Sequence, residues 1–185
     1  YAYQLSEETK LPVLMRVVTR LAHSRAGVVV REPLAQNGLN PETDRTHWVL
    51  LPANARRQYA SLVGKQGDLL ASSENSPYNH SELITHNSKL GVIACGIAYN
   101  YVMENEPQKQ DIPVLKVSQY PLPEAAIKAL AEQCDALLIA EDGQPLVEEQ
   151  VKSILGADYP LKGRLTGDLP RMGELTPDSV GAALG

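Results

Sequence analysis

Polar side chains that can do chemistry lie close together near the start of the sequence. The segment 19–25, TRLAHSR, follows the apolar run 12–18, PVLMRVV. The candidates in this segment are Arg20, His23, Ser24 and Arg25. Arginine pairs with carboxylates, and histidine exchanges protons near neutral pH. We therefore expect a polar cluster at the end of a buried strand, facing a ligand or another domain.

A second candidate site is the pair Cys95 and Gly96, which ends the apolar run 90–96, LGVIACG. Ligands of open parallel sheets collect at the carboxyl ends of the strands. Backbone N–H groups at such a strand-to-helix turn can bind an anion. The alternative is that Gly96 only lets the chain turn, while Cys95 fills a gap in the core.

A third candidate is the acidic pair Glu141 and Asp142, at the end of the apolar segment 136–143, ALLIAEDG. Two neighbouring carboxylates can work as an acid and a base. The alternative is that Asp142 and its neighbours cap the following helix and stabilise its positive end.

The remaining polar motifs indicate structure more than chemistry. His47, His80 and His86 lack the spacing of metal ligands. The string ARRQ, 55–58, can bind phosphate, form a solvated helix face or contact another subunit. Glu148 and Lys152 have the i,i+4 spacing of an ion pair that supports a helix.

Composition predicts a globular protein of the cytoplasm. Hydrophobic residues make up 43% and charged residues 21%, which suffices for a buried core. The net charge of −5 is spread along the chain and argues against nucleic acid as a partner. Cys95 and Cys134 form no CxxC pair, so we expect reduced thiols and no metal site. The sequence has neither a membrane-length apolar run nor a signal-peptide pattern.

Alternation of strands and helices predicts the α/β class. Apolar runs at 90–96, 112–117 and 136–143 alternate with amphipathic segments at 97–105, 121–134 and 144–156. This order predicts β-α-β units, and therefore a mostly parallel open sheet with helices on both faces. Pro145 and Gly156 should bound the third helix, and Thr176 should cap a last helix that begins with Pro177.

The first half of the chain is less regular. Strands are predicted at three apolar segments, 11–18, 26–32 and 47–52. A helix is predicted at 53–74, and the polar segment 75–88 is predicted to be a loop.

Six phrases of the sequence carry a family resemblance. They are PVLMRVVTRLAHSR, WVLLPANARRQ, VIACGIAYNYV, PVLKVSQYPLP, PLVEEQVK and LTGDLPRMGELTPDSV. They resemble the alpha subunits of the indolepyruvate:ferredoxin oxidoreductase family, which belongs to the 2-oxoacid:ferredoxin oxidoreductases. The resemblance implies that 1–31 is the C-terminal edge of a pyrimidine-binding domain. It also implies that 32–89 is a linker region with a short strand and a helix, and that 90–185 is a transketolase C-terminal-like domain.

The resemblance implies oxidative decarboxylation of an aryl pyruvate such as indolepyruvate to an acyl-CoA. In such an enzyme thiamine diphosphate with Mg supplies the decarboxylation chemistry, 4Fe-4S clusters carry electrons to ferredoxin, and coenzyme A accepts the acyl group. A beta subunit is the implied partner. Pyruvate and 2-oxoglutarate are alternative substrates.

The resemblance also places the segment 19–25 near an active site at a domain interface. Arg20 and Arg25 would then pair with the carboxylate of a 2-oxoacid, His23 would relay a proton, and Ser24 would position a ligand. The alternative is that this cluster only pins a linker to the interface. Gly96 is the candidate for contact with coenzyme A.

Much of the family's cofactor machinery is not in this sequence. No GDG occurs, and the nearest strings, EDGQ and TGDLP, lack its downstream partner. The glutamate that serves the cofactor ring is expected before Tyr1, and the cluster-binding cysteines after Gly185. Because the sequence also starts without methionine, we expect a fragment that binds no cofactor and is structural and inert alone. A flavodoxin-like module that binds a phosphate ligand at Gly96 is the alternative.

Overall fold

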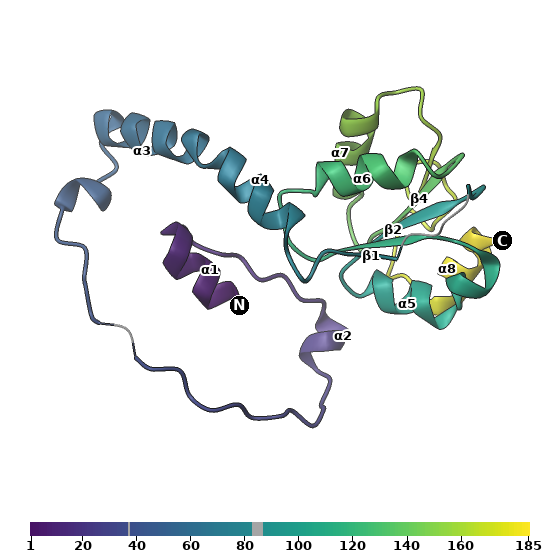
Figure 1. Cartoon of the computed structure of the whole chain (residues 1–185), viewed down its shortest axis with the longest axis horizontal. Helices are drawn as coiled ribbons and strands as arrows, with labels where there is room; N and C mark the ends of the chain where they lie inside the picture. The colour runs from purple at the N-terminus through teal and green to yellow at the C-terminus, as the bar shows by residue number, and fades with distance from the viewer. Residues whose placement is uncertain (37, 83–86) are drawn as a thin grey trace. The chain divides into compact units, whose positions relative to one another are not determined.

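The computed structural model describes residues 1–36, 38–82 and 87–185 (Figure 1). The chain divides into two units, Tyr1–Leu34 and Ala35–Gly185. Among the helices of the described residues, none is long and apolar enough to cross a lipid bilayer.

The N-terminal unit consists of two short helices and extended chain. α1 spans Ala2–Thr9, and α2 spans Thr19–Ala22. The strands predicted at 11–18 and 26–32 are wrong, because both segments are unpaired, and Leu14 is 93% exposed. A strand is stable only when a neighbouring strand pairs with its backbone. The described residues of this unit contain no paired strand.

Helices fill the region before the sheet. They are η1 (Arg45–His47), α3 (Pro52–Gly64) and α4 (Gln66–Glu74). The helix predicted at 53–74 is confirmed, with a break at Lys65. The strand predicted at 47–52 is wrong, because His47 ends the 3-10 turn capped by Asp44, Pro52 begins α3, and the chain at 48–51 pairs with no strand.

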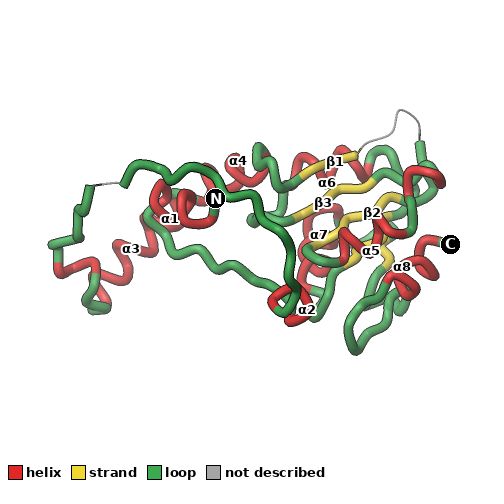
Figure 2. Tube along the Cα trace, turned by 90° about the horizontal axis from the view of Figure 1, so that it is seen from below, coloured by secondary structure: helices red, strands yellow, loops and turns green. Residues whose placement is uncertain are grey.

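A five-stranded sheet forms the centre of the second unit (Figure 2). Its strands are β1 (His80–Glu82), β2 (Gly91–Cys95), β3 (Val114–Val117), β4 (Leu137–Ala140) and β5 (Leu161–Lys162). The order is β1-β3-β2-β4-β5, and every pair is parallel except β1 with β3. The predicted α/β class and mostly parallel sheet are confirmed. Both edge strands were missed, since β1 lies in a polar segment and β5 has only two residues.

Helices cover both faces of the sheet, as predicted (Figure 1). They are α5 (Ala98–Glu104) and α8 (Pro177–Leu184) on one face, and α6 (Glu124–Ala131) and α7 (Leu146–Leu155) on the other. A short 3-10 turn, η2 (Pro107–Gln110), follows α5. Successive side chains of β2 alternate between the faces: Val92 packs toward α5 and α8, and Ile93 toward α6 and α7. The crossover from β2 to β3 runs across the sheet in one direction, and those from β3 to β4 and from β4 to β5 run in the other. Because such crossovers are right-handed, this reversal places helices on both faces.

The predicted helix signals are largely confirmed. Thr176 accepts a hydrogen bond from the backbone of Ser179, whose side chain accepts one in return, so α8 begins with a capping box. Pro145 stands at the N-cap of α7, and Gly156 ends it with φ +90°.

The end of α4 is anchored to the loop between β3 and α6. The Ser73 hydroxyl donates to Gln119 O at 3.1 Å, and Asn79 Oδ1 accepts from Gln119 N at 2.9 Å. Glu74 accepts from Ala125 N at 2.8 Å, at the start of α6. These hydrogen bonds attach the C-terminal end of α4 to the loop after β3 and to the start of α6.

Candidate functional site

Two of the predicted pairs meet at the carboxyl edge of the sheet. β2 and β4 are neighbours, with Ala94 opposite Ala140. The helices that follow these strands, α5 and α7, lie on opposite faces. This arrangement is a topological switch point, the usual ligand position in an open α/β sheet. The residues after the paired alanines are Cys95–Gly96 on β2 and Glu141–Asp142 on β4.

At the end of β2 the cysteine is a core side chain. Cys95 packs with α6 and α7 and is 9% exposed. Burial, and then the nearby charge of Glu141, raise the pKa of the Cys95 thiol well above its usual range. The thiol therefore stays protonated and is a poor nucleophile.

Gly96 makes the turn from β2 into α5. Its φ of +57° lies in the left-handed region, and a side chain there would meet no atom within 4 Å. Its N–H donates to Val117 O at 3.4 Å, and its carbonyl accepts from Tyr99 N at 3.2 Å. Both backbone groups of Gly96 thus have partners within the protein, and a ligand role for this turn stays a prediction.

At the end of β4 the glutamate, rather than the aspartate, caps the next helix. Glu141 Oε2 accepts from Val147 N at 2.9 Å, and Oε1 accepts from Glu148 N at 2.8 Å. Burial raises the pKa of Glu141, the two backbone donors oppose that rise, and the charge of Glu148 adds to it. The geometry therefore supports the cap interpretation of this acidic pair, through Glu141.

Asp142 turns away from the helix and toward the segment that follows β5. Its Oδ1 accepts from Leu175 N at 3.2 Å and from Arg164 Nη2 at 3.1 Å. Asp142 thus ties the β4–α7 turn to the chain before α8.

Arg164 is the main polar residue of this edge, and sequence reasoning missed it. Its side chain is 1% exposed. It donates from Nε to Glu141 O at 2.9 Å, from Nη1 to Pro170 O at 2.7 Å and from Nη2 to Gly173 O at 3.2 Å, besides its bond to Asp142. A guanidinium can satisfy several carbonyls from one position, which permits burial of its charge. The sequence feature that could have pointed to Arg164 is its position inside a segment rich in glycine and proline.

The predicted ion pair of Glu148 with Lys152 is replaced by another contact. Glu148 is 3% exposed, and its Oε2 accepts from Leu165 N at 3.0 Å. Gly163 lies so close that a Cβ there would be 2.5 Å from this oxygen. Glu148 therefore supports the segment after β5 rather than its own helix.

The polar side chains at the ends of β2 and β4 bond to one another and to the backbone, whereas Gln119, just after β3, has a buried Oε1 without a hydrogen-bond partner among the described residues. In the described part of the chain, three or more histidine, cysteine, aspartate or glutamate side chains nowhere gather as a metal site. The carboxyl edge is thus a rigid structural centre, and its geometry gives Glu141 and Asp142 a positioning role.

The N-terminal candidates lie in the first unit. Arg20 is in α2, and His23 is its C-cap. The Ser24 hydroxyl donates to Leu21 O at 2.7 Å. All three candidates are exposed within this unit.

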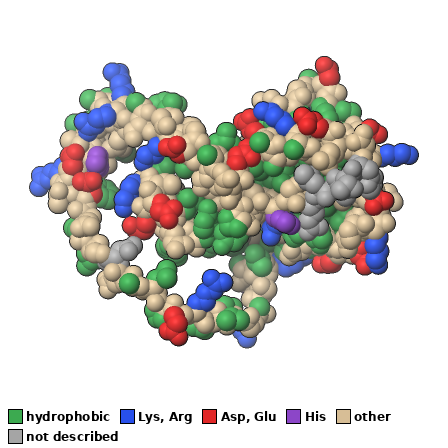
Figure 3. Space-filling view, viewed as in Figure 1, with side chains coloured by type: hydrophobic (Ala, Val, Ile, Leu, Met, Phe, Trp, Pro, Cys, Tyr) green, Lys and Arg blue, Asp and Glu red, His purple; other side chains and the backbone are tan. Residues whose placement is uncertain are grey.

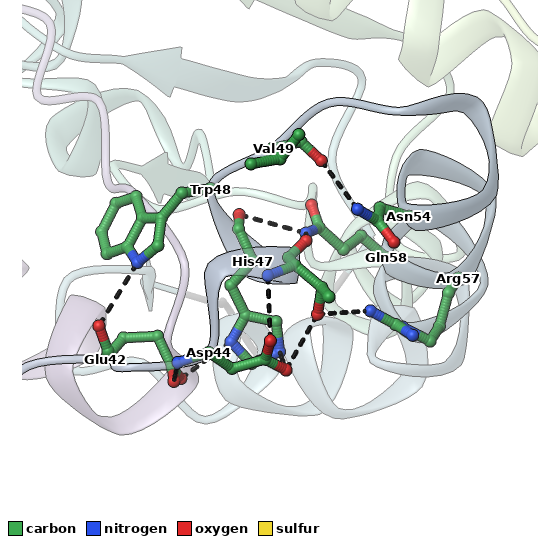
Figure 4. Close-up of polar contacts among 9 residues, drawn as sticks. Glu42, Asp44, His47, Trp48, Val49, Asn54, Arg57 and Gln58 are labelled. Carbon is green, nitrogen blue, oxygen red and sulfur yellow. Dashed lines mark hydrogen bonds and ion pairs between the residues drawn. The ribbon is translucent and has the colours of Figure 1, made fainter.

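The η1 turn brings together His47 and the ARRQ segment (Figure 4). His47 Nδ1 lies 2.7 Å from Glu42 Oε2. Arg57 donates to the Thr46 hydroxyl at 2.7 Å, and Gln58 donates to His47 O at 3.1 Å. A backbone hydrogen bond from Asp44, followed by the contact with His47, lowers the pKa of Glu42. These residues hold the entry to α3; His80 lies in β1, and His86 lies outside the described residues.

Comparison with known proteins finds relatives that match along the whole chain. Subunit IorA of indolepyruvate oxidoreductase from Methanothermobacter thermautotrophicus is 33% identical over 193 residues, which cover 100% of this chain and 31% of that subunit. This chain is thus similar, along its whole length, to one segment of IorA. IorA of Thermococcus kodakarensis is 32% identical over 189 residues, with 95% of this chain and 29% of that subunit covered. The chain thus spans about a third of the length of these curated relatives. No family model matches the sequence.

A solved structure shares the fold of this IorA homologue. It is a 2-oxoglutarate:ferredoxin oxidoreductase from Magnetococcus marinus with 2-oxoglutarate, coenzyme A and succinyl-CoA bound. The match has a TM-score of 0.52 and 16% identity, and it covers 74% of this chain and 24% of that one. At this identity the similarity shows the fold alone.

Proposed function

We propose that this chain is one segment of a 2-oxoacid:ferredoxin oxidoreductase that oxidatively decarboxylates indolepyruvate and related aryl pyruvates. The observation that carries the proposal is the identity of about one residue in three to IorA along the whole chain. The complete enzyme would use thiamine diphosphate, Mg, iron–sulfur clusters and coenzyme A, pass electrons to ferredoxin and work in the cytoplasm.

Within that enzyme the chain acts as a structural and assembly segment that is inert alone. The support is the carboxyl edge, where Arg164, Glu141 and Glu148 are buried and hydrogen-bonded to the protein itself. Groups held in this way keep their positions but present no free acid, base or donor to a substrate.

The residues of this chain do not fit an iron–sulfur cluster. Cys95 and Cys134 lie in one apolar core cluster. Burial raises the pKa of the Cys134 thiol to about 11 and that of Cys95 further, whereas cluster ligands are thiolates. We therefore assign the clusters, and the site for magnesium and thiamine diphosphate, to other parts of the enzyme.

Arg20, His23 and Ser24 remain proposed contacts of the 2-oxoacid. Their types suit a carboxylate and a transferable proton, and all three residues are exposed within the first unit. Arg20→Lys, tested in an active complete enzyme, should raise KM for the 2-oxoacid, because a bidentate pairing is lost. An unchanged KM would remove Arg20 from the substrate site.

A chimera tests the proposed function. The homologous segment of IorA from Methanothermobacter thermautotrophicus is replaced by this chain and coexpressed with the companion subunit. We expect purified chimera to reduce ferredoxin with indolepyruvate and coenzyme A faster than with pyruvate or 2-oxoglutarate. A folded chimera that neither assembles nor oxidises any 2-oxoacid contradicts the proposal.

A phosphate-ligand module is the second candidate, favoured by the switch point beside Gly96. Coenzyme A should then raise the Tm of the chain, and Gly96→Val should abolish the rise. Because φ at Gly96 is +57°, the variant's own unliganded Tm is the reference. The absence of any rise for the unaltered chain excludes this candidate.

A further inference from the structure

One charged residue interrupts the apolar centre of the sheet. The central strands β2, β3 and β4 read GVIAC, VLKV and LLIA, so Lys116 is their only charged residue. Its neighbours Leu115 and Val117 are buried, and Lys116 itself is half-buried. Lysine is rarely enclosed in a core without an acidic partner, because its ammonium then loses water and gains no opposite charge. The position of Lys116 is therefore not explained by packing.

Lys116 contacts an aromatic ring instead of an acid. Its Nζ lies 4.7 Å from the centroid of the Tyr99 ring, in the first turn of α5. Across from it on the neighbouring strands lie Ala94 of β2 and His80 of β1. Among the described residues no carboxylate pairs with Lys116, although acidic and basic side chains are interspersed on the face drawn in Figure 3. An aromatic ring attracts an ammonium but does not neutralise its charge.

Lys116 and Tyr99 lie beside the open turn at Gly96. Lys116 is on the same face of the sheet as Val114, which packs with α5 and α8. The N–H of Tyr99 donates to Gly96 O at 3.2 Å, so the residue that carries the ring is bonded to the turn. Gly96 is exposed, and no described atom lies within 4 Å of the position that its Cβ would take. We call Gly96, Tyr99 and Lys116 the Lys116 site.

A single ammonium at this position suits a phosphate group. Lysine binds phosphate as a compact point charge, whereas a planar carboxylate is matched better by the fork of an arginine. The site lies at the switch point between β2 and β4, where open α/β sheets bind their ligands. A phosphate there supplies the opposite charge that the described residues do not give to Lys116, while the Tyr99 ring holds the ammonium in place.

We propose that Lys116 binds a phosphate group of an anionic ligand at the Lys116 site. This role rests on the second candidate function, the phosphate-ligand module, and gives that module a specific cation. Coenzyme A and inorganic pyrophosphate both carry the required group. The contact binds and orients a ligand but moves no proton, so Lys116 takes no part in the chemistry.

Calorimetric titration of the chain tests this role. The probes are coenzyme A, inorganic pyrophosphate and pantetheine, which carries no phosphate. We expect coenzyme A to bind and pantetheine to bind about tenfold or more weakly, because the contact with Lys116 needs a phosphate. Pyrophosphate that binds as tightly as coenzyme A identifies the phosphate alone as the ligand, and weaker binding shows that the rest of the coenzyme contributes. Pantetheine that binds as tightly as coenzyme A overturns the proposal.

Substitutions of Lys116 give the second arm of the test. Lys116→Met should weaken the Kd for coenzyme A by about tenfold or more, because a charge-assisted contact is lost. Its unliganded Tm should stay unchanged or rise, because methionine packs against Tyr99 without an unpaired charge. Lys116→Gln repeats the measurement with a second neutral side chain. The matched control is Lys152→Met, which removes an exposed charge from α7 and should change the Kd by less than about twofold.

The outcomes separate this role from the functions proposed above. A Kd for coenzyme A that neither neutral variant changes overturns the role of Lys116, while the phosphate-ligand module stands. A fall in unliganded Tm with an unchanged Kd makes Lys116 a structural residue and overturns the proposal as well. If neither coenzyme A nor pyrophosphate binds the unsubstituted chain, both the role of Lys116 and the module are overturned. Oxidation of indolepyruvate by the chimera is a separate measurement, which decides the oxidoreductase function.

Discussion

One buried arginine organises the carboxyl edge at the scale of single residues. Arg164 donates to the end of β4 and to the carbonyls of Pro170 and Gly173 in the segment after β5. Among the described residues, only its bond to Asp142 pairs it with a charge. The other bonds go to carbonyls, whose positions depend on the fold and not on a local motif. For this reason composition and spacing drew attention to Glu141 and Asp142 and not to their common partner.

Replacement of Arg164 tests this role. Arg164→Lys keeps the charge but loses the planar fork, so several buried carbonyls lose their donor. We expect the free energy of unfolding to fall by about 2–4 kcal/mol, measured by urea denaturation. Arg171→Lys is the control, since its exposed side chain should change stability by less than about 0.5 kcal/mol. Equal effects of the two substitutions contradict a structural role for Arg164.

Glu141 gives stability a defined pH dependence. Because its folded pKa is raised above the ordinary value of 4.5, protonation favours the folded state. Its contribution is fully present below the unfolded pKa and is lost as pH rises through the folded pKa. The stability of the unsubstituted chain relative to Glu141→Gln should therefore be greater near pH 4 than near pH 7. Urea denaturation at both values measures this difference, and a greater advantage near pH 7 is the contrary result.

At the scale of elements, the alternating pattern from 90 to 156 predicted β2, β3 and β4 with their helices correctly. These elements bury a periodic apolar face, and periodicity is a local signal. The strands predicted at 11–18 and 26–32 have the same composition but no paired neighbour in their unit. β-propensity alone does not form a strand, because the backbone needs a partner.

Sequence patterns also could not predict the contacts that anchor α4. Asn79 donates to Ser73 O at 3.1 Å and to Gln119 O at 3.0 Å, and thus bridges the chain after α4 and the loop after β3. We expect Asn79→Ala to speed amide hydrogen exchange in α4 while α7 stays protected. Asn75→Ala is the matched control, because the Asn75 side chain donates to Ala71 O in α4 itself. Uniform exchange changes, or none, contradict the anchor.

The turn after β5 depends on a close approach that only glycine permits. Gly163→Ala places a methyl group against the Glu148 carboxylate and should cost about 1–3 kcal/mol of unfolding free energy. Gly64→Ala in α3 meets no atom within 4 Å and should be neutral or stabilising by up to about 1 kcal/mol. Thermal unfolding of both variants compares them. A Gly163→Ala protein as stable as Gly64→Ala would contradict the described packing.

At the scale of the whole molecule, the similarity to IorA supports the proposed place of this chain in an enzyme, which no single motif in the chain reveals. Sequence phrases indicated the family, and similarity along the whole chain to IorA supports it. The candidate site was predicted in part. The ends of β2 and β4 do meet at the switch point. Which polar groups there have hydrogen-bond partners depends on segments that lie far apart in the sequence. We therefore propose that this edge holds segments of the protein in position and takes no part in the chemistry.

The kcat of the assembled chimera carrying Glu141→Gln tests that claim most directly. If Glu141 only caps α7, kcat for indolepyruvate should stay within about threefold of the unsubstituted chimera, while unfolding free energy falls by about 1–2 kcal/mol. If Glu141 were a catalytic acid or base, kcat would fall by about 10²–10⁴-fold in a folded, assembled enzyme. That second result would contradict the account.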